Sequence, residues 1–191
     1  MIENNIHLEQ EHPATGLKFF LASMEEKHIK HLIALAKDSS LIDLLGWNTF
    51  FEAGETEQFI QAISSCAFPY SRNSQPVALG IYLAPESFPI GYVVLKGLNR
   101  DLFTAEIGIA ILDKKHRSKG YGRLALQRFI DYAFNELKIQ TIGAVILCSN
   151  KKSITMFKKL NFLPNQIMHQ SWAMPNGELV DILLMELKST M

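Results

Sequence analysis

The sequence predicts a mixed α/β (α+β) fold in which an antiparallel meander leads into a parallel pair of strands. Three apolar runs, 76–84, 88–98 and 103–112, are separated by short turns, which is typical of antiparallel neighbours. An amphipathic segment, 119–137, then connects the third run to a continuous apolar strand at 141–148. A helical crossover of this length joins parallel strands, so the sheet is predicted to be mixed.

The segments on either side of this centre complete the predicted chain. Residues 1–15 are polar and aperiodic, so we expect a loosely held arm there. The run 17–24 is predicted to be a strand, and helical spacing of apolar residues predicts helices over 25–37, about 41–45 and about 56–66.

A helix over 150–160 and a closing hairpin of strands 167–174 and 178–187 are predicted for the C-terminal part. The sequence shows no repeat and no linker, so one domain spanning 1–191 is expected. The hairpin could pair with a second copy of the chain, which would make a homodimer.

Composition excludes several classes of partner. The chain has 19 Lys+Arg and 19 Asp+Glu, and this balance gives no general attraction to nucleic acid or acidic membranes. Two cysteines are too few for a disulfide framework, and neither a signal peptide nor a membrane span is visible. We therefore expect a cytoplasmic protein that binds neither nucleic acid nor membrane.

The stretch from Glu106 to Arg123 is the most informative part of the sequence. A strand runs into a basic loop, and two glycines, Gly120 and Gly122, open the following helix. Backbone amides at a helix start, with glycines that permit close approach, predict an anion-binding loop. The spacing matches neither the dinucleotide fingerprint nor the nucleoside-triphosphate loop, which favours another phosphate ligand. The alternative is a solvated turn before a helix.

The loop resembles the acyl-CoA-binding motif of the GNAT acetyltransferase superfamily, Arg/Gln-x-x-Gly-x-Gly/Ala, here from Arg117 to Gly122. A second run, Asn150-x-x-Ser153-x-x-x-Phe157, is similar to the family's Asn-x-x-Ala/Ser-x-x-x-Tyr. The resemblance covers about 76–165. It implies a three-layer α/β/α fold whose parallel central strands splay apart.

The resemblance also implies a cosubstrate, acetyl-CoA, and residues to hold it. Amides of 117–122 would bind the pyrophosphate, backbone groups of 109–111 would pair with the pantetheine arm, and Asn150 would contact the arm from the other side. The residues expected to bind it are Ile109, Ala110, Ile111, Arg117, Ser118, Lys119, Gly120, Tyr121, Gly122, Asn150, Ser153 and Phe157. No metal is expected, because His28 and His31 have no further ligand pattern beside them.

Glu106 is the candidate catalytic residue. It shares one face of its strand with Gly108 and Ala110, which indicates a place kept open, although a polar strand edge would show the same pattern. The resemblance places Glu106 where some family members have a general base. The alternative is that Glu106 forms a salt bridge or binds substrate charge. Phe157 stands where the family often has a tyrosine acid, and it cannot donate a proton.

Together these features predict an acetyl-CoA-dependent N-acetyltransferase that moves the acetyl group directly to a primary amine. The acceptor would be a small molecule or a protein N-terminus. The Ala-Glu-Ile-Gly start of the central strand most resembles the branch that contains ribosomal-protein N-terminal acetyltransferases. Trp47, Phe50 and Phe51 would pack in the core or line the acceptor pocket. Alternatives are an acyl-CoA sensor without turnover, or a transferase for a larger acyl group or a hydroxyl acceptor.

Overall fold

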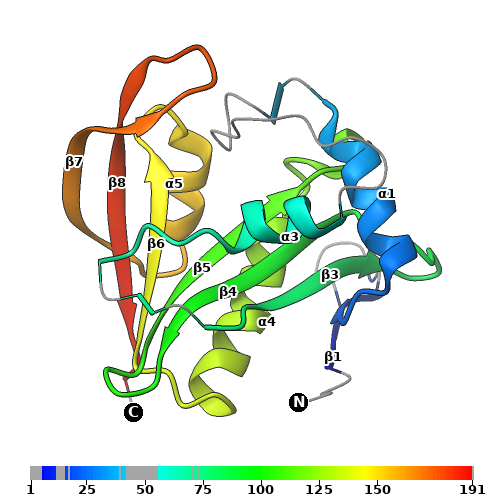
Figure 1. The fold of residues 1–191 in the computed structure, drawn as a ribbon. Coiled ribbons are helices and arrows are strands. Elements are labelled where there is room, and N and C mark those ends of the chain that lie inside the picture. Colours follow the sequence, from blue (N-terminus) through cyan, green and yellow to red (C-terminus); the bar gives the residue numbers. More distant parts are fainter. Residues whose placement is uncertain are drawn as a thin grey trace.

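The structure is a computed structural model, and eight strands form one sheet in the order β1-β2-β3-β4-β5-β6-β8-β7 (Figure 1). Every pairing between these described strands is antiparallel except that of β5 with β6. The residues that the structure describes are 6–11, 16, 18–38, 40–41, 56–69, 71–72 and 74–190.

The elements follow the predicted order. The strands are β1 (His7–Glu11), β2 (Lys18–Ala22), β3 (Val77–Leu83), β4 (Gly91–Asn99), β5 (Thr104–Ile111), β6 (Thr141–Leu147), β7 (Leu163–Ala173) and β8 (Leu179–Lys188). The helices are α1 (Glu26–Ala36), α3 (Thr56–Ser64), the short 3-10 helix η1 (Lys114–His116), α4 (Tyr121–Asn135) and α5 (Lys151–Lys158).

Helices cover both faces of the sheet, which makes three layers (Figure 1). On one face, Leu32 of α1 and Phe59 of α3 pack against Tyr92 of β4. On the other face, Phe129 of α4 packs in a larger core that contains Val93 of the same strand. Because successive residues of a strand point to opposite sides, β4 is buried by both layers. The predicted three-layer fold with its mixed sheet is confirmed.

The two parallel strands separate soon after they meet. β5 and β6 pair over three positions, ending with Glu106 opposite Gly143. Both strands continue for several residues, but β5 stays bonded to β4 and β6 to β8. The predicted splay of the central strands is therefore confirmed, and it opens the middle of the sheet.

The N-terminal segment differs from the predicted loose arm. His7–Glu11 forms β1, which pairs antiparallel with β2 at the edge of the sheet. The ring of His7 lies 4.8 Å from that of Phe20 between ring centroids. The five residues of β1 contain one apolar side chain, Leu8, so the sequence carries little strand signal and the pairing with β2 decides the conformation.

The C-terminal hairpin closes the sheet as predicted, with a turn over 175–177. β8 inserts between β6 and β7, so β7 forms the outer edge. The helix predicted near 41–45 falls almost wholly outside the described residues. Within the described ranges, none of the helices is both long and apolar enough to cross a bilayer.

Candidate active site

A large cleft lies where β5 and β6 diverge, with a volume of about 1710 Å³. Pockets for one drug-sized ligand usually measure roughly 300–1,000 Å³, so this cleft is larger than a usual single-ligand pocket. Its lining includes Ile109 and Met156 from the side covered by α4 and α5, and Ile63 and Val94 from the side covered by α1 and α3. The cleft therefore reaches both faces of the sheet; we call them the α4/α5 face and the α1/α3 face.

The loop before α4 has the backbone of an anion cradle. Ser118 has φ +60° and Gly120, the N-cap of α4, has φ +91°. Left-handed residues between ordinary ones turn successive N–H groups toward one point, and the first amides of a helix lack partners within it. A side chain at Gly120 would be strained, whereas a Cβ at Gly122 would meet Met156 and two isoleucines at ordinary contact distances of 3.5–3.7 Å. This explains why the motif tolerates alanine only at its second glycine.

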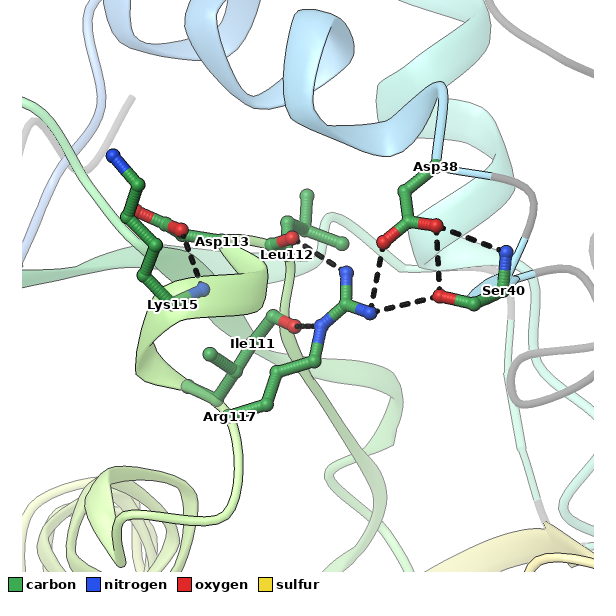
Figure 2. A network of polar contacts seen from close by, with 7 residues as sticks. All are labelled: Asp38, Ser40, Ile111, Leu112, Asp113, Lys115 and Arg117. Carbon is green, nitrogen blue, oxygen red and sulfur yellow. Dashed lines mark hydrogen bonds and ion pairs between the residues drawn. The ribbon is translucent and has the colours of Figure 1, made fainter.

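The side chain of Arg117 has other partners than a phosphate (Figure 2). Its Nε donates to the carbonyl oxygen of Ile111 at 3.0 Å, and Nη2 donates to that of Leu112 at 2.6 Å. Nη1 lies 2.9 Å from Ser40 Oγ and 3.0 Å from Asp38 Oδ2. Arg117 thus ties the end of β5 to the segment after α1. The loop offers backbone groups to a ligand, and its arginine serves the fold.

Asp38 is ionised in this contact. Hydrogen bonds from the hydroxyl and amide of Ser40, together with the Arg117 guanidinium, hold the pKa of Asp38 below its ordinary value. On the other side of the loop, Asp113 caps η1 by accepting from the Lys115 amide at 2.9 Å. The contacts of Asp113 and Arg117 therefore hold the loop before α4 in place.

The other predicted cosubstrate residues all lie in or beside the cleft. Ile109, Ala110 and Ile111 continue β5 past its last pairing with β6, so that edge of the backbone faces the opening. Lys119 and Tyr121 belong to the loop and the helix start, and the Tyr121 side chain is buried in the core.

The second predicted motif forms the opposite wall at α5. Asn150 caps this helix, its Oδ1 accepting from the Ser153 amide at 3.0 Å. Phe157 is 3% exposed and packs edge-on against Phe162, with ring centroids 4.9 Å apart. Asn150, Ser153 and Phe157 line the same cleft as the loop, as the resemblance to the family's second motif implied.

Glu106 is almost fully enclosed by donors. Its Oε2 accepts from the amides of Ala67 and Phe68, both at 2.8 Å, and from the Cys66 thiol at 2.9 Å. Its Oε1 lies 3.0 Å from Lys96 Nζ, which also donates to the Ser65 carbonyl. A carboxylate offers about four acceptor sites, so Oε2 is saturated and only Oε1 keeps room for another donor.

This network attaches the segment after α3 to the middle of the sheet. The ring of Phe68 lies over Gly143, where a Cβ would come within 2.2 Å of it. Burial and the Glu106 carboxylate raise the pKa of the Cys66 thiol to about 11, so Cys66 is a hydrogen-bond donor and not a nucleophile. The structure thus shows Glu106 in the salt bridge that was the alternative to catalysis, and Glu106 is also among the residues that line the cleft.

Sequence reasoning missed three residues of this site. Lys96 and Asp38 were not singled out, because a single charged residue carries no pattern until its partner is known. Trp172, from the outermost strand, lines the cleft as well. Trp47, Phe50 and Phe51 lie outside the described residues. Within the described ranges, no group of three or more His, Cys, Asp or Glu side chains could hold a metal ion.

The site is a split sheet with a single cleft that is lined from both faces and has the left-handed loop before α4 at its side. A family model described as acetyltransferase (GNAT) domain matches residues 18–163. The chain belongs to this family and is an acetyltransferase of the GNAT type, as the two motifs predicted.

Individual relatives agree with this assignment. The chain is 24% identical over 167 residues to an uncharacterized N-acetyltransferase, p20, of Bacillus licheniformis, covering 87% of this chain and 90% of that protein. It is 39% identical over 84 residues to the probable N-acetyltransferase YjcK of Bacillus subtilis, covering 44% and 46%. Both names contain the predicted activity.

Among solved structures, the fold is similar to a spermidine N-acetyltransferase from Vibrio cholerae in complex with CoA and spermine. The TM-score is 0.75 at 19% identity, and the match covers 89% of this chain and 95% of that one. This likeness confirms the fold. It is not specific to the branch of ribosomal-protein acetyltransferases that the strand sequence resembles.

Proposed function

We propose that this protein transfers the acetyl group of acetyl-CoA to a primary amine that enters from the α1/α3 face. The observation that carries the proposal is the cleft through the sheet, with the anion cradle beside α4 and an opening under α3. In the reaction the amine nitrogen bonds to the acetyl carbon, the carbon–sulfur bond breaks, and the amine proton leaves. Thiols have a pKa near 8.5, so the CoA thiolate can leave without a proton from Phe157.

The residues present fit acetyl-CoA. The left-handed Ser118 and Gly120 shape a cradle that suits a pyrophosphate, and five basic residues line the cleft around it: Lys114, Arg123, Lys151, Lys152 and Lys159. The unpaired edge of β5 beyond Glu106 offers backbone groups to an extended arm, as an added strand would use them.

Glu106 remains our candidate general base, acting through Oε1. Oε1 contacts Lys96, whereas Oε2 already accepts three hydrogen bonds, and Glu106 is one of the residues that line the cleft. A base must reach the amine within hydrogen-bond distance or through one water, and Oε1 is the atom that can do so. The test is the pH profile of Glu106→Gln: a base gives a rate that falls and loses its acidic limb, while a purely structural carboxylate leaves the profile's shape unchanged.

We propose an α-amino group as the acceptor. Glu106 is the one carboxylate in the described lining of the cleft, and Lys96 already balances its charge. A polyamine carries several positive charges, and a lining with one carboxylate that is already paired would bind those charges weakly. An α-amino group has a reference pKa near 7.7–8.0, against about 10.4 for a lysine-like amine, so it also needs less help to lose its proton. Protein N-termini, including ribosomal ones, belong to this class.

The experiment follows release of CoA thiol from acetyl-CoA with a panel of amines. The panel contains a peptide with a free N-terminus, an amino-acid amide and spermidine. We expect turnover with the first two and a lower kcat/KM with spermidine. Preference for spermidine would contradict the proposed acceptor, and would leave the acetyl transfer itself intact.

The second candidate function is an acyl-CoA sensor. Phe157 favours it, because a buried phenylalanine at this position cannot protonate the leaving group. Tight binding of acetyl-CoA in calorimetry without turnover of any amine would establish the sensor. Turnover with succinyl-CoA or a hydroxyl acceptor in preference to acetyl-CoA and an amine would establish the remaining alternatives.

A further inference from the structure

Trp172 lines the cleft although its strand, β7, lies at the edge of the sheet and two strands away from β6. It belongs to β7, the outer strand of the sheet, and is half-buried while most residues of that strand are exposed. Three cross-strand pairs trace its direction, since partners in a sheet point to the same side: Glu106 with Gly143, Leu147 with Ile182, and Val180 with Trp172. Trp172 therefore lies on the α1/α3 face, the side of Glu106 and of the opening under α3.

An irregularity in the hairpin brings Trp172 to this place. Met168 pairs with Ile182 and Trp172 with Val180, so four steps along β7 match two along β8. The extra residues include Gln170, whose φ of +48° is left-handed. Bulges bend a strand and aim a side chain that regular pairing would direct elsewhere.

Asp181 of β8 holds this irregular segment. Its Oδ1 accepts the backbone N–H of Gln170 at 2.9 Å, and its Oδ2 lies 2.9 Å from His169 Nδ1. The hydrogen bond from the Gln170 amide lowers the pKa of Asp181 most, and the contact with His169 lowers it further, so the carboxylate is charged at neutral pH. The Asp181 carbonyl also accepts from the Cys148 amide at 2.9 Å, which joins the hairpin to the strand end before Asn150.

The residues that line the cleft around Trp172 are apolar, and those on the opposite side have small side chains. Val145 and Leu147 of β6 and Ile182 of β8 line its side of the cleft, whereas β5 presents Gly108 and Ala110. A tryptophan ring offers a large flat surface that packs against carbon chains and other rings. Small residues across from it leave room for such a group.

We infer that Trp172 is the specificity-determining residue for the acceptor, packing against an apolar or aromatic side chain carried next to the reacting amine. Asp181 is the positioning residue that holds Trp172 there through the irregular segment. The inference rests on the proposed function and narrows its acceptor class to α-amines with an apolar neighbour.

Two matched probes test the inference: phenylalanine amide and glycine amide present the same α-amino group with and without an aromatic side chain. We expect the wild-type protein to prefer phenylalanine amide in kcat/KM. Trp172→Ala should reduce that preference by about tenfold, mainly through KM, since loss of apolar contact in a pocket has effects of this size. Trp172→Phe should keep most of the preference, and CoA affinity should be unchanged in both variants.

Asp181 is tested by rescue. Asp181→Ala should lower the preference for phenylalanine amide, and Asp181→Asn should restore it, because the asparagine carbonyl can still accept from the Gln170 amide. Leu179→Ala is the control, since Leu179 is on the same hairpin, is 53% exposed and does not line the cleft.

Calorimetry of each amide with the CoA-bound protein separates this inference from the proposed function. If the wild-type protein turns over neither amide, acetyl transfer to amines of this class fails, yet the two binding constants can still be compared with those of Trp172→Ala. Equal affinity of the wild-type protein for both amides, or an unchanged ratio in Trp172→Ala, would overturn the role of Trp172.

Discussion

Glu106 and Arg117 lie near the two ends of β5, and both were expected to meet a ligand. In the structure each ties β5 to the segment that carries α1 and α3: Glu106 holds the amides of Ala67 and Phe68, and Arg117 holds Asp38 and Ser40. The difference lies in the backbone. After Arg117 the loop takes left-handed turns at Ser118 and Gly120, and the Arg117 amide donates to the Lys114 carbonyl, whereas around Glu106 the neighbouring amides are bonded to the carboxylate.

The two charged residues bond to different parts of the protein: Arg117 to side chains and strand-end carbonyls, and Glu106 mainly to backbone amides. At the Arg117 end the fold uses the side chain, and the loop backbone is our proposed site for the phosphates. At the Glu106 end the fold uses the backbone of the partner segment, and the proposed base, Oε1, contacts Lys96. The two charged residues together fix the segment that carries α1 and α3, at the end of α1 and at the end of α3.

The largest effect is expected on stability from Glu106→Ala. The change leaves the Ala67 and Phe68 amides without their acceptor and Lys96 with the Ser65 carbonyl alone, and breaking a buried ion pair by removing one partner costs about 3–5 kcal/mol. Denaturant unfolding should show this loss. Lys96→Met is the matched control and should cost less, because the carboxylate keeps three donors. A loss below about 1 kcal/mol for Glu106→Ala would mean that the network does not hold the segment after α3.

The next effect is on CoA affinity from Gly120→Asp. The substitution forces a left-handed φ of +91° on an ordinary residue and sets a carboxylate against the phosphates. Like charges in contact cost several kcal/mol, so we expect CoA binding to weaken by about 100-fold or more in calorimetry.

Gly122→Ala provides the control for that experiment, because its Cβ finds ordinary contacts. Its CoA affinity should stay within about threefold of the wild-type value, which is under 1 kcal/mol. If both glycine variants bind CoA as tightly as the wild-type protein, the loop does not hold the ligand.

Arg117→Gln should affect stability more than CoA binding. The change removes the ion pair with Asp38 and at least one of the hydrogen bonds to the end of β5, at a cost of about 1–3 kcal/mol. CoA affinity should change by less than about threefold, because the phosphate contacts come from the backbone. A loss of affinity that exceeds the loss of stability would show that the guanidinium reaches the phosphates.

The last prediction concerns the reactivity of the Cys66 thiol, whose expected effect on stability at neutral pH is small. With its pKa raised to about 11, roughly one thiol in a thousand is ionised at pH 8, so alkylation by iodoacetamide should be far slower in the native than in the unfolded protein. The raised pKa favours the folded state below the ordinary thiol pKa, and this contribution is lost as pH rises from about 8.5 toward 11. Mass spectrometry of the labelled Cys66 peptide measures the rate. Equal rates in the two states would contradict the contact with Glu106.

Much of the fold was predictable from periodicity. The meander β3–β5, the crossover helix α4 and strand β6 all follow from runs of apolar residues and short turns, and they appear within a few residues of the predicted bounds. β1 was missed, because a five-residue strand at a sheet edge depends on β2 and not on its own pattern.

The candidate site divides in the same way. The sequence by itself determined the conformation of the loop, because Gly120 and the start of α4 set the backbone locally, and the resemblance of its second motif to the family's placed Asn150 and Phe157 beside the cleft. Only the tertiary structure decided what the charges do. Glu106 and Arg117 found partners about 40 and 77 residues away in the chain, and Trp172 reached the cleft from the far edge of the sheet. A backbone conformation is encoded by its neighbours in sequence, whereas the partner of a charged or aromatic side chain is chosen by which segments the packed core brings within a few ångströms.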